Sequence, residues 1–131
     1  MKRIICMIIG ALLCFATAEA QQQKRQGKVY DVVEVMPEYP GGMSEMMNFL
    51  HHNVRYPEAA MKKKIQGRSV IRFVVEKDGS LSDFKVVRSA GSLLDAEALR
   101  VAKSMPKWKP GKLKGKTVRV KYMLPVSFRL E

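Results

Sequence analysis

A β-hairpin signal between Gly67 and Gly91 is the feature that most constrains how this chain can fold. Two runs rich in β-branched and aromatic residues flank Asp78-Gly79, a dipeptide typical of a type I′ turn, which needs positive φ at both central residues. Period-two spacing places the following residues on one face: Ile71, Phe73, Val75, Phe84 and Val86. Because an isolated hairpin is only marginally stable in water, we expect other segments to cover this face.

The first twenty residues have the pattern of an export signal. Lys2-Arg3 precedes an apolar run from Ile4 to Ala16, and Ala18-Glu19-Ala20 is a small-x-small cleavage motif. We therefore predict a signal peptide over residues 1–20 and a periplasmic protein. An uncleaved inner-membrane anchor is the alternative, although the apolar run is shorter than the roughly 20 residues of a membrane span.

The cysteines agree with export. Cys6 and Cys14 both lie inside the predicted signal, so the exported part would carry neither disulfides nor thiol chemistry. Lipidation of Cys14 is a further alternative for the N-terminus. Residues 21–36 are predicted to be a disordered lead with a weakly alternating edge strand over residues 28–36. The remaining residues, 37–131, suit one small domain.

The chain is strongly basic, with a formal net charge of +12. From Val101 onward it has nine Lys or Arg residues and a single acidic residue, Glu131. A basic face attracts nucleic acid, anionic lipid or an acidic partner. The last two fit an exported protein better, and no nucleic-acid-binding motif is present, so we expect no nucleic acid partner.

Apolar periodicity predicts three helices. Met43, Met46, Met47 and Leu50 form one stripe, with Ser44 able to cap its start. Pro57 fits the first position of a short second helix, which Gly67 follows. In the longest helix we expect Ser92 to be the N-cap and Asp95 to complete a near capping box. Its apolar stripe consists of Leu94, Ala98, Val101, Ala102 and Met105.

Nothing in the sequence indicates catalysis, a cofactor or a metal site. No nucleophile, base and orienting group occur in a recognisable set, and no glycine-rich phosphate loop is present. His51-His52 lacks a third ligand at a suitable spacing, so we interpret the pair as surface residues. Trp108, the single tryptophan, is interpreted as a core residue.

The final strand alternates most regularly, from Val118 to Phe128. A right-handed crossover through the longest helix would place it beside the first hairpin strand, giving the order second–first–last. The last strand is then at an edge, where Pro125 is tolerated. Basic residues such as Arg119 and Lys121 guard an edge against aggregation. The same edge could instead bind an extended peptide.

Several motifs occur together in the order and at the spacing of a known family. They are Tyr56-Pro57-Glu58-Ala59-Ala60, Ile65-Gln66-Gly67, Val74 to Gly79, Met105 to Lys112, and Val118 to Leu130. From about Val33 onward the chain resembles the TonB C-terminal domain, most closely the form common in Bacteroidetes-type bacteria. The resemblance implies an α+β fold with a three-stranded antiparallel sheet, the hairpin plus a C-terminal edge strand, packed against helices.

The resemblance also implies a site. In the family, the TonB box, a short N-terminal peptide of outer-membrane receptors, pairs with the last strand and touches the segment before Tyr-Pro. The matching positions here are Val118, Arg119, Val120, Lys121, Tyr122, Met123 and Leu124, with Asn53, Val54, Arg55 and Tyr56. Arg119, Lys121 and Arg55 would favour acidic peptides.

The chain departs from a full energy transducer, which has an uncleaved anchor, inner-membrane motor partners and a long proline-rich spacer. Residues 21–28, fully extended, reach only about 28 Å. Three functions stay open: a free periplasmic module binding TonB boxes, an anchored transducer, and a structural protein binding cell wall or anionic lipid through residues 107–121. A homodimer through the last strand is a further expectation.

Overall fold

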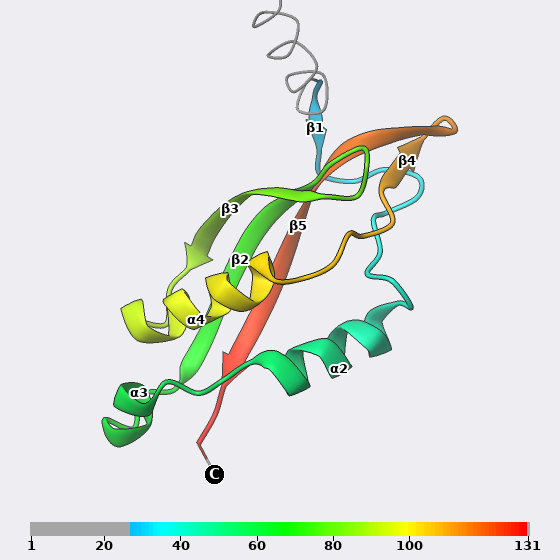
Figure 1. Ribbon diagram of the computed structural model, residues 1–131. Coiled ribbons are helices and arrows are strands. Elements are labelled where there is room, and N and C mark those ends of the chain that lie inside the picture. Colours follow the sequence, from blue (N-terminus) through cyan, green and yellow to red (C-terminus); the bar gives the residue numbers. More distant parts are fainter. Residues whose placement is uncertain (1–26, 131) are drawn as a thin grey trace, which may run out of the picture.

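The computed structural model describes residues 27–130, which form an α+β fold with three helices and one five-stranded sheet (Figure 1). The predicted signal peptide, the cysteines and most of the lead lie outside these residues. The strands are β1 (Val29–Tyr30), β2 (Gly67–Val75), β3 (Leu81–Arg88), β4 (Gly111–Leu113) and β5 (Lys116–Phe128). The helices are α2 (Met43–Asn53), α3 (Glu58–Lys62) and α4 (Ser92–Lys103). Within residues 27–130, no helix is both long and apolar enough to cross a membrane.

The centre of the sheet confirms the predicted strand order. Strand β2 lies between β3 and β5 and is antiparallel to both. Its register with β5 runs without a break from Gly67 opposite Phe128 to Val75 opposite Val120. Figure 1 shows these two long strands side by side, with α4 across β2 and β3 and α2 beside β5.

The sheet is wider than the three strands expected. At its N-terminal end, β5 extends past the last residue of β2, and two short strands pair with this part. Gly111 to Leu113 of β4 lie antiparallel to residues 116–118, whereas Val29 and Tyr30 of β1 lie parallel to Arg119 and Val120. The lead therefore contributes two strand residues rather than the nine expected over residues 28–36, and β5 is an edge strand along only part of its length.

The hairpin is present, but its turn differs from the type I′ turn predicted. Asp78 keeps a negative φ, and only Gly79 is left-handed, with φ 88°. The Gly79 N–H donates to the Glu76 carbonyl at 2.9 Å, and the Glu76 N–H donates to the Ser80 carbonyl at 2.8 Å. This pattern is a three-residue loop that ends in a left-handed residue. A Cβ on Gly79 would lie 2.1 Å from the Trp108 carbonyl oxygen, so glycine is required here.

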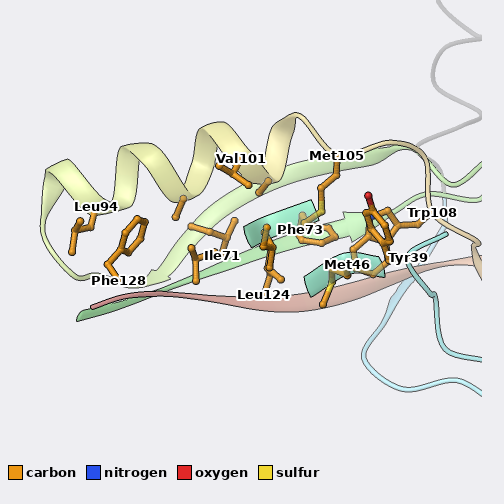
Figure 2. Packing of buried hydrophobic residues seen from close by; sticks show 14 of the residues in the cluster. Tyr39, Met46, Ile71, Phe73, Leu94, Val101, Met105, Trp108, Leu124 and Phe128 are labelled. Atoms are coloured by element: carbon orange, nitrogen blue, oxygen red, sulfur yellow. The ribbon is translucent and has the colours of Figure 1, made fainter. Parts of the chain in front are cut away.

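The core lies between the sheet and the helices, as predicted. Ile71, Phe73 and Val75 are fully buried beneath α4. The predicted apolar stripe is buried throughout, although its last member, Met105, lies just past the end of α4. Figure 2 shows Leu94 and Val101 pointing from α4 toward Ile71 and Phe128 on the sheet. The ring of Trp108 lies edge-on to those of Phe73 and Tyr122, at centroid distances of 5.3 and 4.7 Å. Trp108 is thus a core residue.

The predicted helix caps are wrong. Helix α2 has Gly42 as its N-cap and α4 has Gly91, and neither helix has a side-chain capping hydrogen bond. Asp95 instead connects the start of α4 to strand β2 and to the loop before the helix. Its carboxylate accepts hydrogen bonds from Ser69 Oγ on β2 at 2.7 Å and from the Ala90 N–H at 2.9 Å.

The methionine stripe of α2 is only partly a core stripe. Met46 and Leu50 are buried, whereas Met43 and Met47 are 62% and 56% exposed. Met46 packs beside Leu124 in Figure 2. Helix α2 therefore contacts the sheet along a narrower face than its sequence indicates.

Candidate functional site

The C-terminal part of β5 has one open edge. From Lys121 to Phe128, β5 pairs with β2 on one side. On the other side of this segment, no strand among residues 27–130 pairs with it. Eight extended residues span roughly 26 Å, enough for a peptide of similar length to add to the sheet.

Three of the predicted site residues lie in the closed part of β5. Val118 is paired with Gly111 of β4, and Arg119 and Val120 are paired with β1. A partner strand would have to displace β1 to reach Arg119 and Val120. The continuous peptide site expected over residues 118–124 is therefore divided, and only residues 121–124 lie on the open edge.

Arg119 is buried rather than presented to solvent. Its Nε donates to Glu76 Oε1 at 2.8 Å and its Nη2 to Glu76 Oε2 at 3.2 Å. A third bond joins Nη1 to the Gly27 carbonyl at 3.1 Å, and Ser82 Oγ donates to the same Glu76 carboxylate. Glu76 is 2% and Arg119 8% exposed. This bidentate geometry offsets the desolvation of both groups, so Arg119 holds the sheet together and has little charge to offer a peptide.

Along the open edge, side chains alternate between the two faces. Tyr122 and Leu124 turn toward the core, and partial burial raises the pKa of the Tyr122 phenol. Lys121 and Met123 lie on the opposite face, where the Lys121 ammonium is 3.4 Å from Asp31 and Met123 is half exposed. A strand added here would pair with the main chain of β5. On this face it would also contact the cation of Lys121 and the flexible apolar side chain of Met123.

The segment from Asn53 to Tyr56 lies at the far end of this edge. The Tyr56 ring packs edge-on against Phe128 at a centroid distance of 5.7 Å, and its hydroxyl donates to the Ile65 carbonyl. Tyr56 therefore marks the C-terminal limit of the open edge, some eight strand residues from the closed part.

The main chain before Tyr56 is already engaged by neighbouring helices. Val54 N–H donates to Leu50 in α2, Arg55 N–H donates to Glu97 Oε2 at 2.6 Å, and Arg100 Nη2 donates to the Asn53 carbonyl at 2.8 Å. Hydrogen bonding from Arg100 is the largest cause that lowers the pKa of Glu97. This segment is thus held in place by α4 and offers side chains more than main-chain groups.

The site residues implied by the family resemblance end at Leu124. The edge strand expected from the alternation reaches Phe128, and in the structure the open edge does so too. Elsewhere, His51 and His52 are exposed on α2 with their rings edge-on at 5.6 Å. Among residues 27–130, no three His, Cys, Asp or Glu side chains gather as metal ligands would.

Comparison with known proteins identifies the family. Residues 52–130 match the family described as the Gram-negative bacterial TonB protein C-terminal domain. The chain belongs to this family. A search of curated protein sequences finds no match. The family is one of non-catalytic transport and interaction domains, with a TonB-like role in TonB-dependent transport.

One solved structure shares the fold. A solution structure of the Helicobacter pylori TonB C-terminal domain is 26% identical, with a TM-score of 0.52, and the alignment covers 70% of this chain and 87% of that one. A shorter fragment of the same domain is 27% identical with a TM-score of 0.48, covering 65% and 89%. Family membership implies interaction with outer-membrane receptors in general, and action in the periplasm or from a membrane anchor. The Bacteroidetes type and the signal peptide stay predictions.

Proposed function

We propose that this chain is a periplasmic binding module that captures the TonB box of outer-membrane receptors by strand addition to β5. The observation that carries the proposal is the open edge over residues 121–128. Main-chain pairing supplies affinity in this binding mode, while alternate side chains supply selectivity. Lys121 favours an acidic residue in the peptide, and Tyr56 lies at the end of the open edge, against Phe128.

The proposed contacts differ from those carried over from the family. Lys121, Tyr122, Met123 and Leu124 keep their role through the main chain, and residues 125–128 join them. Val118, Arg119 and Val120 are assigned to the support of the edge, because β4 and β1 pair with them. Asn53, Val54 and Arg55 would contact only the end of a bound peptide.

The test is an N-methyl scan of a synthetic TonB-box peptide. The peptide carries the modification because Tyr122 and Leu124 pack in the core, where substitution would disturb folding. In an added strand only alternate N–H groups point to the neighbouring strand. We expect N-methylation at every second position to weaken binding strongly and at the intervening positions to have little effect. Amide shifts in the protein should map to residues 121–128.

A matched control is Lys114→Asn in the β4–β5 turn, since Asn tolerates the left-handed φ of 53° there. It should leave peptide affinity unchanged. Shifts confined to residues 107–116, or N-methyl effects without alternation, would contradict strand addition and favour the basic-surface alternative.

The same edge could pair with a second copy of the chain. If a homodimer forms through β5, the dimer and the peptide compete for the same edge, so the apparent peptide affinity should fall as the protein concentration rises. Analytical ultracentrifugation measures the fraction of dimer at each concentration. Inner-membrane motor proteins are expected partners only if the N-terminus is retained as a membrane anchor. The intact mass from periplasmic and membrane fractions separates these cases: a soluble species starting at Gln21 supports the free module, whereas a membrane species retaining Met1 supports the transducer.

A further inference from the structure

The sheet has a second face, opposite the helices. Here alternate residues of the three long strands point away from the core, among them Arg72 on β2, Lys85 on β3 and Met123 on β5. Lys85 and Met123 are exposed and Arg72 is half-buried. In Figure 1 the helices gather on the other face. Among residues 27–130 no helix covers this face around Lys85 and Met123, although Val74 and Arg119 on the same face are buried.

Two cations lie directly opposite each other at its centre. Arg72 and Lys85 are cross-strand partners in the β2–β3 register. Among residues 27–130, neither forms an ion pair or side-chain hydrogen bond. Like charges at directly opposed positions destabilise a sheet. The pair therefore works against folding, and a bound anion would relieve its repulsion.

The pair borders a shallow hollow that is lined by both polar and apolar residues. The residues lining it are Val29, Arg72, Val74, Asp83, Phe84, Lys85 and Lys121. Val74 is 5% exposed. The single carboxylate, Asp83, lies with Oδ2 3.7 Å from Arg119 Nη2, on the side of the buried ion pair. Of the three lining cations, Lys121 is paired with Asp31 at 3.4 Å, and Asp83 already has a cationic neighbour. Arg72 and Lys85 are left without a carboxylate partner among residues 27–130, so the hollow favours anions.

The shape of the hollow decides which anion source fits. A lipid surface is bound by cations that project outermost, with apolar side chains inserted beside them. Here Arg72 is half-buried, the apolar residue Val74 is almost fully buried and so cannot insert into a membrane, and β1 contributes Val29 to the lining. A narrow extended polypeptide with carboxylate side chains can enter such a hollow, whereas a flat membrane cannot.

We propose that this hollow, named the Arg72–Lys85 site, is a second docking site that binds an acidic segment of a protein partner. The site lies on the face of the sheet rather than on the edge of β5. It goes beyond the proposed function, because strand addition uses main-chain groups of β5, whereas this site uses the side-chain cations Arg72 on β2 and Lys85 on β3. Lys121 borders both sites, so variants of Arg72 and Lys85 are the ones that separate them.

The test uses a synthetic hexaglutamate peptide and two double variants with the same change of charge. Arg72→Gln/Lys85→Gln removes the opposed pair, and Lys62→Gln/Lys63→Gln removes two exposed cations at the end of α3. We expect the wild-type protein to bind hexaglutamate with amide shifts at residues 72, 85 and 121. The first variant should bind about tenfold more weakly or worse, and the second within about twofold of wild type.

Stability gives an independent readout. The Arg72→Gln/Lys85→Gln variant should melt at a higher temperature than wild type, because the repulsion is removed, while binding is lost. If the pair instead had a purely structural role, this variant would melt at a lower temperature than wild type. TonB-box affinity should not change by more than about twofold in this variant, which separates failure of this site from failure of the edge.

Three outcomes would overturn the proposal. One is equal weakening of hexaglutamate binding by both variants, which would indicate net charge alone. Another is the absence of hexaglutamate binding at low salt. The third is binding to phosphatidylglycerol vesicles that the Arg72–Lys85 variant abolishes while hexaglutamate does not bind, which would assign the site to lipid.

Discussion

The two parts of β5 share one sequence pattern and have opposite surroundings. Residues 116–120 are closed by β4 and β1, and Arg119 is sealed by Glu76. Residues 121–128 have β2 on one side and an open edge on the other. Polar and apolar residues alternate in the sequence from Val118 through both parts, but burial alternates regularly only from Met123 onward. Accessibility of a strand is therefore determined by segments distant in the sequence and not by the strand itself.

The difference assigns separate tasks to the two parts. The closed part fixes β5 within the sheet through a buried ion pair and two short strands. Under the proposed function, the open part is the one that receives another chain. Variants at the closed part should change stability, and changes at the open part should change binding.

The largest effect is expected for Glu76→Gln. It leaves the Arg119 guanidinium buried without its carboxylate, which typically costs about 3–5 kcal/mol. Urea denaturation monitored by Trp108 fluorescence should show this loss in the free energy of unfolding. Asp83→Asn is the control, since its carboxylate is 69% exposed and 3.7 Å from Arg119; its effect should stay below about 1 kcal/mol. A loss of less than about 1 kcal/mol for Glu76→Gln would contradict the anchoring role.

Asp95→Ala should cause an intermediate loss of stability. Asp95 bonds Ser69 on β2, and Ser69 lies opposite Val126 in the open part of β5. The carboxylate accepts hydrogen bonds from Ser69, Ser89 and the Ala90 N–H. Loss of these bonds should cost about 2 kcal/mol, measured by thermal unfolding. Ser92→Ala is the control, because no side-chain cap at this helix start depends on it. A comparable loss in that variant would mean that the helix start, not the Asp95 network, matters.

The pH dependence of stability sharpens the same prediction. Burial pushes the pKa of Asp95 upward, but the hydrogen bonds from Ser89, Ala90 and Ser69 outweigh it and hold the pKa below its usual value. A group with a lowered folded-state pKa stabilises the protein above its unfolded pKa, about 4 for Asp. This contribution disappears as the pH falls through the lower folded-state pKa. Asp95→Asn should flatten the decline in melting temperature over that acidic range.

The smallest effect is expected for Asp31→Asn, which removes the ion pair with Lys121 at the junction of the two parts. Both side chains are well exposed, so stability should change by no more than about 0.5 kcal/mol. Binding should respond more, since freeing Lys121 makes its charge available to an acidic peptide. Calorimetry at low and high salt measures this; a salt-independent affinity in both proteins would show that Lys121 takes no part.

Periodicity was sufficient to predict the centre of the fold. The inward faces of β2 and β3, the apolar stripe of α4 and the order β3-β2-β5 were all predicted from spacing and confirmed. These features depend on local pattern and on the handedness of one crossover. They could therefore be inferred without any knowledge of distant contacts.

The rest depended on contacts that no local pattern contains. Arg119 occupies an outward position by alternation, and its burial follows from Glu76, 43 positions earlier. The exposed Met43 and the buried Met46 have the same side chain, so only packing against the sheet distinguishes them. Pairing of β1 with β5 joins segments some 90 positions apart. The boundary between the open and closed parts of the candidate site follows from that pairing and was unpredictable for the same reason.

The long-range pairing of β2 with β5 also has a consequence for how the domain folds. Gly67 meets Phe128 and Val75 meets Val120, so each pair closes a loop of between 45 and 61 positions. Loop closure of this length must occur before the pairing can stabilise the chain, which slows folding. The β2–β3 hairpin can form early, but the main-chain groups along the free edge of β2 stay exposed to water until β5 pairs with them. Until β5 pairs, the unpaired edge of β2 is the part of the sheet most prone to aggregate with another chain.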